Sequence, residues 1–325
     1  MTVSFKDIKG EGSAIAFLKN AVLGGRVASA YIFLGPSGCG KKLTAVNFAK
    51  LLNCAAPAEG EPCEKCASCI RINSMAHPDV LVLEKEEKKA EFGIDVVLEA
   101  IRSVSLKPYE ARKKVYILDD ADLMTEPAQN AVLKTLEEPP QDVVLVLMVE
   151  DIHTIPATIK SRSQIVKFFP MPAADIEKIL KDDHKIDAKD AGILAGLSLG
   201  SIGRALANSK NGFLDKRARV IDGLRSKKIF DSDFEKMKRD DFAGYLDIML
   251  SWYRDILVAK AFAGKEAGIL NTDRIDDVKR EAKRLSFEYL DNAVNAVADA
   301  RGHLDRNANP KLTMSVLSIK LESKT

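Results

Sequence analysis

The sequence predicts an α/β domain with a three-layer architecture around a parallel sheet, followed by helical domains. Two observations carry this prediction. In residues 1–170, short apolar runs rich in β-branched residues alternate with stretches of helical spacing, as buried parallel strands and their covering helices do. After Pro170-Met171-Pro172 the strand-like runs end, and amphipathic helical patterns take over. A chain of 325 residues is also long enough for two or three domains.

Four apolar runs are expected to form the strands of the sheet. They are Tyr31–Leu34, Val80–Leu83, Val115–Leu118 and Val143–Val149. Because strands alternate with helices, we expect parallel pairing and a ligand-binding edge at the carboxyl ends of the strands.

Helical spacing lies between these runs and dominates the rest of the chain. In the first part it involves Ile15, Leu18 and Val22, then Val96, Ile101 and Val104, and later Ala131 to Leu136. Farther on, Asp175–Lys181 and Asp187–Asn208 are predicted short helices, and residues 212–325 show longer amphipathic patterns. The predicted domains are therefore an α/β domain over 1–170, a small helical lid domain over 171–210 and an all-helical domain over 211–325.

A glycine-rich loop follows the first predicted strand. It reads Gly35-Pro36-Ser37-Gly38-Cys39-Gly40-Lys41-Lys42 and leads into a helical run, which is the context of a phosphate-binding loop. Gly35, Gly38 and Gly40 would let backbone N–H groups face phosphate oxygens, and Lys41 would reach the terminal phosphates. A working loop continues with Ser or Thr, whose hydroxyl binds magnesium, but here Lys42 has no acceptor to offer.

Four cysteines lie within 16 residues, spaced C-x8-C-x2-C-x2-C. They are Cys54, Cys63, Cys66 and Cys69. Four thiolates saturate a tetrahedral zinc ion, so this module (about 54–69) predicts a structural Zn²⁺ site with no open position. Disulfides, an iron–sulfur cluster and unligated buried cysteines are the alternatives, the first of them disfavoured in cytoplasm. Cys39 lies inside the glycine loop and is interpreted as a small filling side chain.

Acidic residues follow two later strands. Asp119 and Asp120 come directly after Val115–Leu118, where an acidic residue beside a phosphate-binding loop usually helps to hold magnesium. Asp120 stands where a Glu would polarise the attacking water, and its side chain is one methylene shorter. The alternative is an ordinary strand-to-helix turn. Glu150, after the fourth strand, would repel a terminal phosphate.

Composition excludes several classes of protein. The content of 46% apolar and 30% charged residues is typical of a soluble globular chain, and no apolar run approaches the roughly 20 residues of a membrane span. Residues 1–10 contain no apolar signal core, so a cytoplasmic location is expected. A net charge of +2 gives no whole-molecule attraction to nucleic acid.

Several segments together resemble a known family. They are residues 4–21 (SFKDIKGEGSAIAFLKNA), the cysteine cluster, residues 131–140 (AVLKTLEEPP) and residues 158–163 (TIKSRS). Through them the chain resembles the AAA+ clamp-loader ATPases of bacterial DNA polymerase III, and in particular their delta prime branch. The resemblance is strong from about Ser4 to Phe169. In the C-terminal domain it depends on helical character and on the patch Trp252–Asp255.

The resemblance implies a ring in which each nucleotide site lies between two subunits. The family's Ser-Arg-Cys motif falls on Ser161 and Arg162, with Ser163 in place of Cys, and sends its arginine into the neighbour's site. Taken without the family, Arg162 would be read as a surface arginine. Arg204 resembles the lid arginine of active members. The implied partners are the gamma/tau ATPase and delta subunits and, through the complex, the sliding clamp and primer–template DNA, with no membrane. The C-terminal domain would form a collar.

Three hypotheses follow for the function. The first is an ATPase-silent clamp-loader subunit with weak or no ATP or ADP binding, because Lys42, Asp120 and Glu150 remove parts that act together. The second is an active gamma-type ATPase that tolerates an unusual loop. The third is a zinc-containing nucleic-acid-binding protein, for which salt-dependent DNA binding by the lone chain would be expected.

Overall fold

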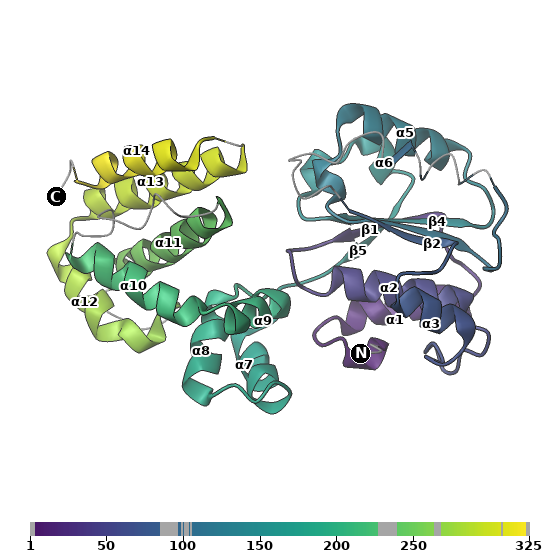
Figure 1. Ribbon diagram of the computed structural model, residues 1–325, viewed down its shortest axis with the longest axis horizontal. Helices are drawn as coiled ribbons and strands as arrows, with labels where there is room; N and C mark the ends of the chain where they lie inside the picture. The colour runs from purple at the N-terminus through teal and green to yellow at the C-terminus, as the bar shows by residue number, and fades with distance from the viewer. Residues whose placement is uncertain are drawn as a thin grey trace. The chain divides into compact units, whose positions relative to one another are not determined.

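A parallel sheet lies at the centre of the first part of the chain (Figure 1). The computed structural model describes residues 4–84, 97–98, 100, 104, 106–226, 239–262, 268–306 and 308–322. Within these residues, five parallel strands pair in the order β2-β3-β4-β1-β5. The strands are β1 (Ala30–Leu34), β2 (Val80–Leu83), β3 (Lys114–Leu118), β4 (Val143–Val149) and β5 (Gln164–Lys167). The predicted α/β fold with a parallel sheet is confirmed.

Helices cover both faces of the sheet. The helical elements are η1 (Phe5–Asp7), α1 (Gly12–Leu23), α2 (Lys41–Asn53), α3 (Ala67–Asn73), η2 (Ala121–Leu123), α5 (Glu126–Glu137), η3 (Ile152–Thr154) and α6 (Ala157–Lys160). Figure 1 shows α1, α2 and α3 on one face and α5 and α6 on the other. Side chains of β1 alternate between the layers: Tyr31 packs with Phe48 of α2, whereas Ile32 belongs to the core that contains Val132 of α5.

The strand β5 was not predicted from the sequence. It forms the edge of the sheet beside β1, and only Val166 of its four residues is buried. An edge strand this short lacks the continuous apolar run that marked the other four. Of the helical triplet predicted after the loop, Val104 is helical and buried, while Val96 and Ile101 lie outside the described residues.

The chain divides into two compact units. The first unit holds Met1–Met171 with Ser201–Gly203, and the second holds Pro172–Gly200 with Arg204–Thr325. The described helices of the second unit are α7 (Ala173–Asp182), α8 (Ala188–Leu197), α9 (Ile202–Lys210), α10 (Phe213–Ser226), α11 (Arg239–Ala261), η5 (Thr272–Arg274), α12 (Ile275–Arg284), α13 (Phe287–Asp305) and α14 (Pro310–Glu322). The first two residues of α9 are assigned to the first unit. The three-domain division, with its boundary near residue 210, stays a prediction.

The core of the second unit gathers around α11. This helix buries Phe242, Leu246, Met249, Trp252 and Ile256, which recur at the spacing of a helical face. Partner side chains come from α10, α12, α13 and α14. In the described part of the chain, none of the helices is both long and apolar enough for a membrane span.

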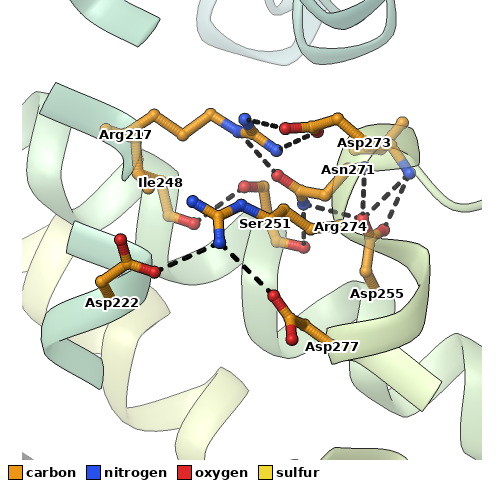
Figure 2. Close-up of polar contacts among 10 residues, drawn as sticks. Arg217, Asp222, Ile248, Ser251, Asp255, Asn271, Asp273, Arg274 and Asp277 are labelled. Carbon is orange, nitrogen blue, oxygen red and sulfur yellow. Dashed lines mark hydrogen bonds and ion pairs between the residues drawn. The ribbon is translucent and has the colours of Figure 1, made fainter. Parts of the chain in front are cut away.

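A buried polar network holds residues 268–274, the part of the junction between α11 and α12 that directly precedes α12 (Figure 2). The fully buried Asp255 carboxylate accepts hydrogen bonds from the backbone N–H of Leu270 and, at 2.7 Å, from that of Asn271. Arg217 of α10 donates to Asn271 and forms a two-pronged ion pair with Asp273. Because each buried charge in this network has a hydrogen-bond or ion-pair partner, the polar groups can be buried without leaving a charge unpaired.

Candidate functional site: a degenerate phosphate-binding loop and its surroundings

The carboxyl ends of four neighbouring strands meet at one edge of the sheet. The glycine loop follows β1, Glu84 follows β2, Asp119 follows β3 and Glu150 follows β4. Parallel strands end at the same edge, so these side chains are brought together although they come from distant parts of the sequence. The structure therefore gathers the predicted loop and the acidic residues on the expected ligand edge.

The backbone of the loop has a shape that only glycine adopts easily. Gly38 and Gly40 have φ values of +71° and +102°, in the left-handed region. Gly40 directly precedes the first residue of α2. At Gly35 a Cβ atom would lie 2.6 Å from the carbonyl oxygen of Phe168, so the adjoining chain leaves no room for a side chain. The loop keeps its glycine-dependent conformation.

Lys41, the lysine expected to reach phosphate, is turned back onto its own loop. Its side chain is buried, and Nζ donates to the carbonyl oxygens of Gly35 and, at 3.0 Å, of Pro36. Phosphate binding by this ammonium would require these contacts to be exchanged.

Lys42 lies between two carboxylates at the start of α2. Its Nζ is 3.2 Å from Oδ2 of Asp119 and forms a second ion pair with Glu84. Burial lowers the pKa of Lys42, but the hydrogen bonds with Glu84 and Asp119 outweigh that effect and hold the pKa above its ordinary value. Sequence reasoning missed Glu84 as a member of this edge. Its place directly after a predicted strand was the available signal.

The acidic residues after β3, Asp120 and Asp122, differ in their local structure and contacts. Asp120 directly precedes the short helix η2 and adopts φ = +53°, so its backbone is in the left-handed region. The next acid along, Asp122, accepts the backbone N–H of Glu150 at 3.2 Å through Oδ2. Glu150 itself is exposed. The edge thus carries several negative charges where a nucleotide would bring more.

Arg162 lies at the opposite edge of the sheet. It follows α6 and directly precedes Ser163 and the start of β5, which pairs in parallel with β1. Its side chain is 40% exposed, and the guanidinium donates to the carbonyl oxygen of Thr158 at 3.1 Å and lies 3.7 Å from Oε1 of Glu137. Ser161 Oγ also donates to the Thr158 carbonyl. Arg162 is therefore accessible to another molecule.

Arg204, the predicted lid arginine, is engaged inside the second unit. Its guanidinium pairs with Asp247 of α11 at 2.9 Å, and Arg301 of α13 binds the other oxygen of the same carboxylate at 3.1 Å. The two partners are far apart in sequence, so this pairing could not be predicted from local pattern.

The four predicted metal ligands come together in the first unit. The Sγ atoms of Cys54, Cys63, Cys66 and Cys69 all lie within 4.8 Å of one another, and Cys54 and Cys69 are buried. Backbone N–H groups of Cys63 and Cys66 donate to the sulfurs of Cys54 and Cys63 at 3.2 and 3.3 Å. Hydrogen bonds led by the Lys65 N–H lower the pKa of Cys63 to about 6, which favours a thiolate.

These donors fit a thiophilic metal and do not fit magnesium. Sulfurs that surround a zinc ion at about 2.3 Å lie close together at the corners of a tetrahedron, and no oxygen ligand is needed. At the loop, in contrast, an ammonium stands beside the acid that would hold magnesium. The cysteine module is the candidate metal centre among the described residues.

The fold and the site define a class. A parallel sheet with a glycine loop after the inner strand β1, and an acidic residue after β3, which β4 separates from β1, is the arrangement of P-loop α/β proteins. Within that class, two family models match this chain: "DNA polymerase III, delta subunit" over residues 10–172 and "DNA polymerase III, delta subunit, C terminal" over residues 212–322.

Relatives found by sequence agree with the family models. The DNA polymerase III subunit delta' of Bacillus subtilis strain 168 is 32% identical over 339 residues, which cover 99% of each chain. The tau subunit of the same organism is 28% identical over 98% of this chain, and the chain spans 61% of tau. A solved gamma subunit-related protein of Thermotoga maritima has 18% identity and a TM-score of 0.46, covering 96% of this chain and 100% of that one. The chain belongs to the DNA polymerase III delta-subunit family, and its predicted resemblance to the delta prime branch is confirmed.

Proposed function

We propose that the chain is the ATPase-silent delta prime subunit of a DNA polymerase III clamp loader. In this role it helps to place the sliding clamp on primed DNA, and it supplies Arg162 to the nucleotide site of a neighbouring ATPase subunit. The observation that carries the proposal is the contrast between the two edges of one sheet: an exposed arginine at one edge and a loop whose lysines are both engaged at the other.

The loop edge supports a silent site. Lys41 binds its own loop, Lys42 binds acids, and Asp120 replaces the longer carboxylate that would orient water. Parts of a catalytic site act as a unit, so the loss of several lowers turnover far more than the loss of one would suggest.

The position of Arg162 supports action on a neighbour. β1 and β5 run parallel with Tyr31 opposite Gln164, so Arg162 lies near the amino end of β1, whereas the loop follows its carboxyl end. At about 3.3 Å per residue these points are roughly 15 Å or more apart. This separation from its own loop supports a role for Arg162 at a partner's site, and its planar, permanently charged guanidinium is suited to phosphate.

The remaining features support structure and assembly. The four cysteines would hold zinc with all ligands from the protein, which pins the segment between α2 and α3. On α14, Leu312, Val316 and Ile319 are exposed while Met314 and Leu317 are buried, so the last helix carries a second apolar face. Such a face suits contact with the gamma/tau and delta subunits.

A second candidate function is an active gamma-type ATPase. The 28% identity with tau over 98% of this chain favours it. The two candidates differ in what the isolated chain does with ATP, because an active subunit hydrolyses it and a silent one does not.

Two measurements on the wild-type chain test the proposal. The first is single-turnover ATP hydrolysis by the isolated, metal-replete chain, for which we expect no magnesium-dependent product. The second is reconstitution with the gamma/tau and delta subunits of the same organism, for which we expect one complex on size exclusion that loads the clamp. Turnover by the isolated chain would support the gamma-type ATPase, and failure to enter the complex would remove the delta prime role.

A further inference from the structure

Lys42, the residue after the loop lysine, does more than lack a metal-binding hydroxyl: it forms ion pairs with two acids. Lys42 is the second residue of α2, and its ammonium lies 3.2 Å from Asp119 and in contact with Glu84. Those acids follow β3 and β2, two strands that pair with each other in the sheet. The ammonium thus contacts one carboxylate from the end of each of two paired strands, while the Lys42 side chain stays 40% exposed.

This position is the one from which a working loop binds its metal. There the residue after the lysine offers a hydroxyl and the acid at the end of β3 completes the magnesium site. Here the same two positions are bonded directly to each other as cation and anion. An ammonium offers donors alone and carries a charge of the same sign as the metal, so the two cannot share the site.

We propose that the Lys42 ammonium takes the place of magnesium at this loop, so that the site is closed to metal–nucleotide complexes by occupation and not merely by the loss of a ligand. The inference rests on the proposed silent function and adds its physical cause. Removing the charge at position 42 should open a divalent-cation site formed by Asp119 and Glu84, even when no hydroxyl is restored.

The charge of Lys42 persists over the working range of pH. Asp119 and Glu84 are the acids that pair with it, and they outweigh the effect of burial on its pKa. Glu84 is 57% exposed and Asp119 is 28% exposed, so water and ions can reach the carboxylates once the ammonium is removed. Carboxylate oxygens are the ligands that magnesium and manganese prefer.

Four variants of the full chain distinguish occupation of the metal position by the Lys42 ammonium from the loss of a hydroxyl ligand. Lys42→Thr restores a hydroxyl, Lys42→Met removes only the charge, and Lys42→Arg keeps the charge. The double variant Lys42→Thr with Asp119→Asn removes the acid at the end of β3 as well. The probe is Mn²⁺, counted by electron paramagnetic resonance on zinc-replete protein, with circular dichroism to confirm that each variant is folded.

We expect Lys42→Thr and Lys42→Met each to bind Mn²⁺ at least about tenfold more tightly than the wild type, a change of the size that altered metal surroundings produce. Lys42→Arg and the double variant should behave like the wild type. In calorimetry, Mn²⁺ should strengthen ATP binding by Lys42→Thr but not by the wild type.

Two results would overturn the inference. One is a wild-type chain that binds Mn²⁺ as tightly as Lys42→Thr does. The other is a folded Lys42→Met with no gain in Mn²⁺ affinity, which would mean that the missing hydroxyl alone explains the site. Neither result depends on ATP turnover by the wild type, so the inference can fail while the silent-subunit proposal stands.

Discussion

Lys42 and Arg162 lie at opposite edges of the same sheet, and their surroundings differ in kind. Both side chains are 40% exposed, but Lys42 contacts two acids of its own chain, whereas the nearest acid to Arg162 lies at 3.7 Å. Arg162 can exchange its single long ion pair for contact with an incoming phosphate at little cost, because one exposed ion pair contributes only about 0–1 kcal/mol. Lys42 would have to leave two carboxylates to do the same. At the residue scale, these contacts are consistent with the proposed action of Arg162 on a partner and with the retention of Lys42 by its own chain.

Glu11, at the start of α1, gives a residue-scale prediction about pH. Burial raises the pKa of its carboxyl to about 7, although the backbone N–H of Phe169 opposes the shift. A pKa that is higher in the folded than in the unfolded chain adds stability at low pH, and this stability is lost as the pH rises from about 4.5 through about 7. The free energy of unfolding of Glu11→Gln, relative to that of the wild type, should therefore increase by roughly 1 kcal/mol when the pH is raised from about 6 to about 8.

Urea unfolding at the two pH values measures this difference. Glu126→Gln, which changes an exposed acid in the first turn of α5, serves as the control and should follow the wild type. If Glu11→Gln and the wild type change in parallel with pH, the buried carboxyl is not the cause.

Sequence reasoning could predict part of the candidate site and not its contacts. The glycine loop, the missing hydroxyl at Lys42 and the acids after the third predicted strand were all legible because each depends on local spacing. The Glu84 contact was not, because it required knowing that β2 lies beside β3 in the sheet. The pairing of Arg204 with Asp247 was hidden for the same reason, since tertiary packing decides it.

At the scale of elements, the strands show what periodicity can and cannot reveal. The run Val143–Val149 is buried at every residue and was predicted with its observed bounds. The edge strand β5 buries only Val166, so it carries no continuous apolar signal. Strand order was also beyond prediction, because β1 lies between β4 and β5, which come much later in the chain.

The cysteine module, between α2 and α3, yields a prediction about metal removal. Cys66→Ser should lose stoichiometric zinc and melt at a lower temperature than the wild type, because a structural metal contributes folding energy through its ligands. Elemental analysis gives the metal content, and Cys39→Ser, a change outside the cluster, should retain zinc. A wild-type chain without metal would contradict the assignment, and visible absorbance with bound iron would replace zinc by an iron–sulfur cluster.

The junction between α11 and α12 yields a prediction about stability. Asp255→Ala should destabilise the second unit by about 3–5 kcal/mol, because it removes the buried acceptor shared by Leu270 and Asn271 and leaves their donors unpaired. The fluorescence of Trp252, the single tryptophan of the chain, reports unfolding of this unit during urea titration.

Asp299→Ala is the matched control for this experiment. Asp299 is exposed and lies 3.9 Å from Lys320, so its removal should cost less than about 1 kcal/mol. Equal losses in the two variants would show that the buried network does not hold the junction.

At the scale of the whole molecule, both units carry the same family relationship. The two family models match residues 10–172 and 212–322, and the Bacillus subtilis delta' subunit aligns over 99% of the chain. The first unit presents Arg162, and the second presents an apolar face on α14. These two features support the proposed role of the chain as a subunit that joins a neighbour and acts on its nucleotide.

The turnover of a reconstituted clamp loader that contains Arg162→Ala tests this account most directly. At the site that receives it, an arginine of this kind contributes about 10³- to 10⁵-fold to turnover. We expect the complex to assemble as with the wild type and its DNA-stimulated ATPase rate to fall. Lys167→Ala, an exposed cation at the other end of β5, should leave the rate unchanged. An intact complex that hydrolyses ATP at the wild-type rate with Arg162→Ala would contradict the account.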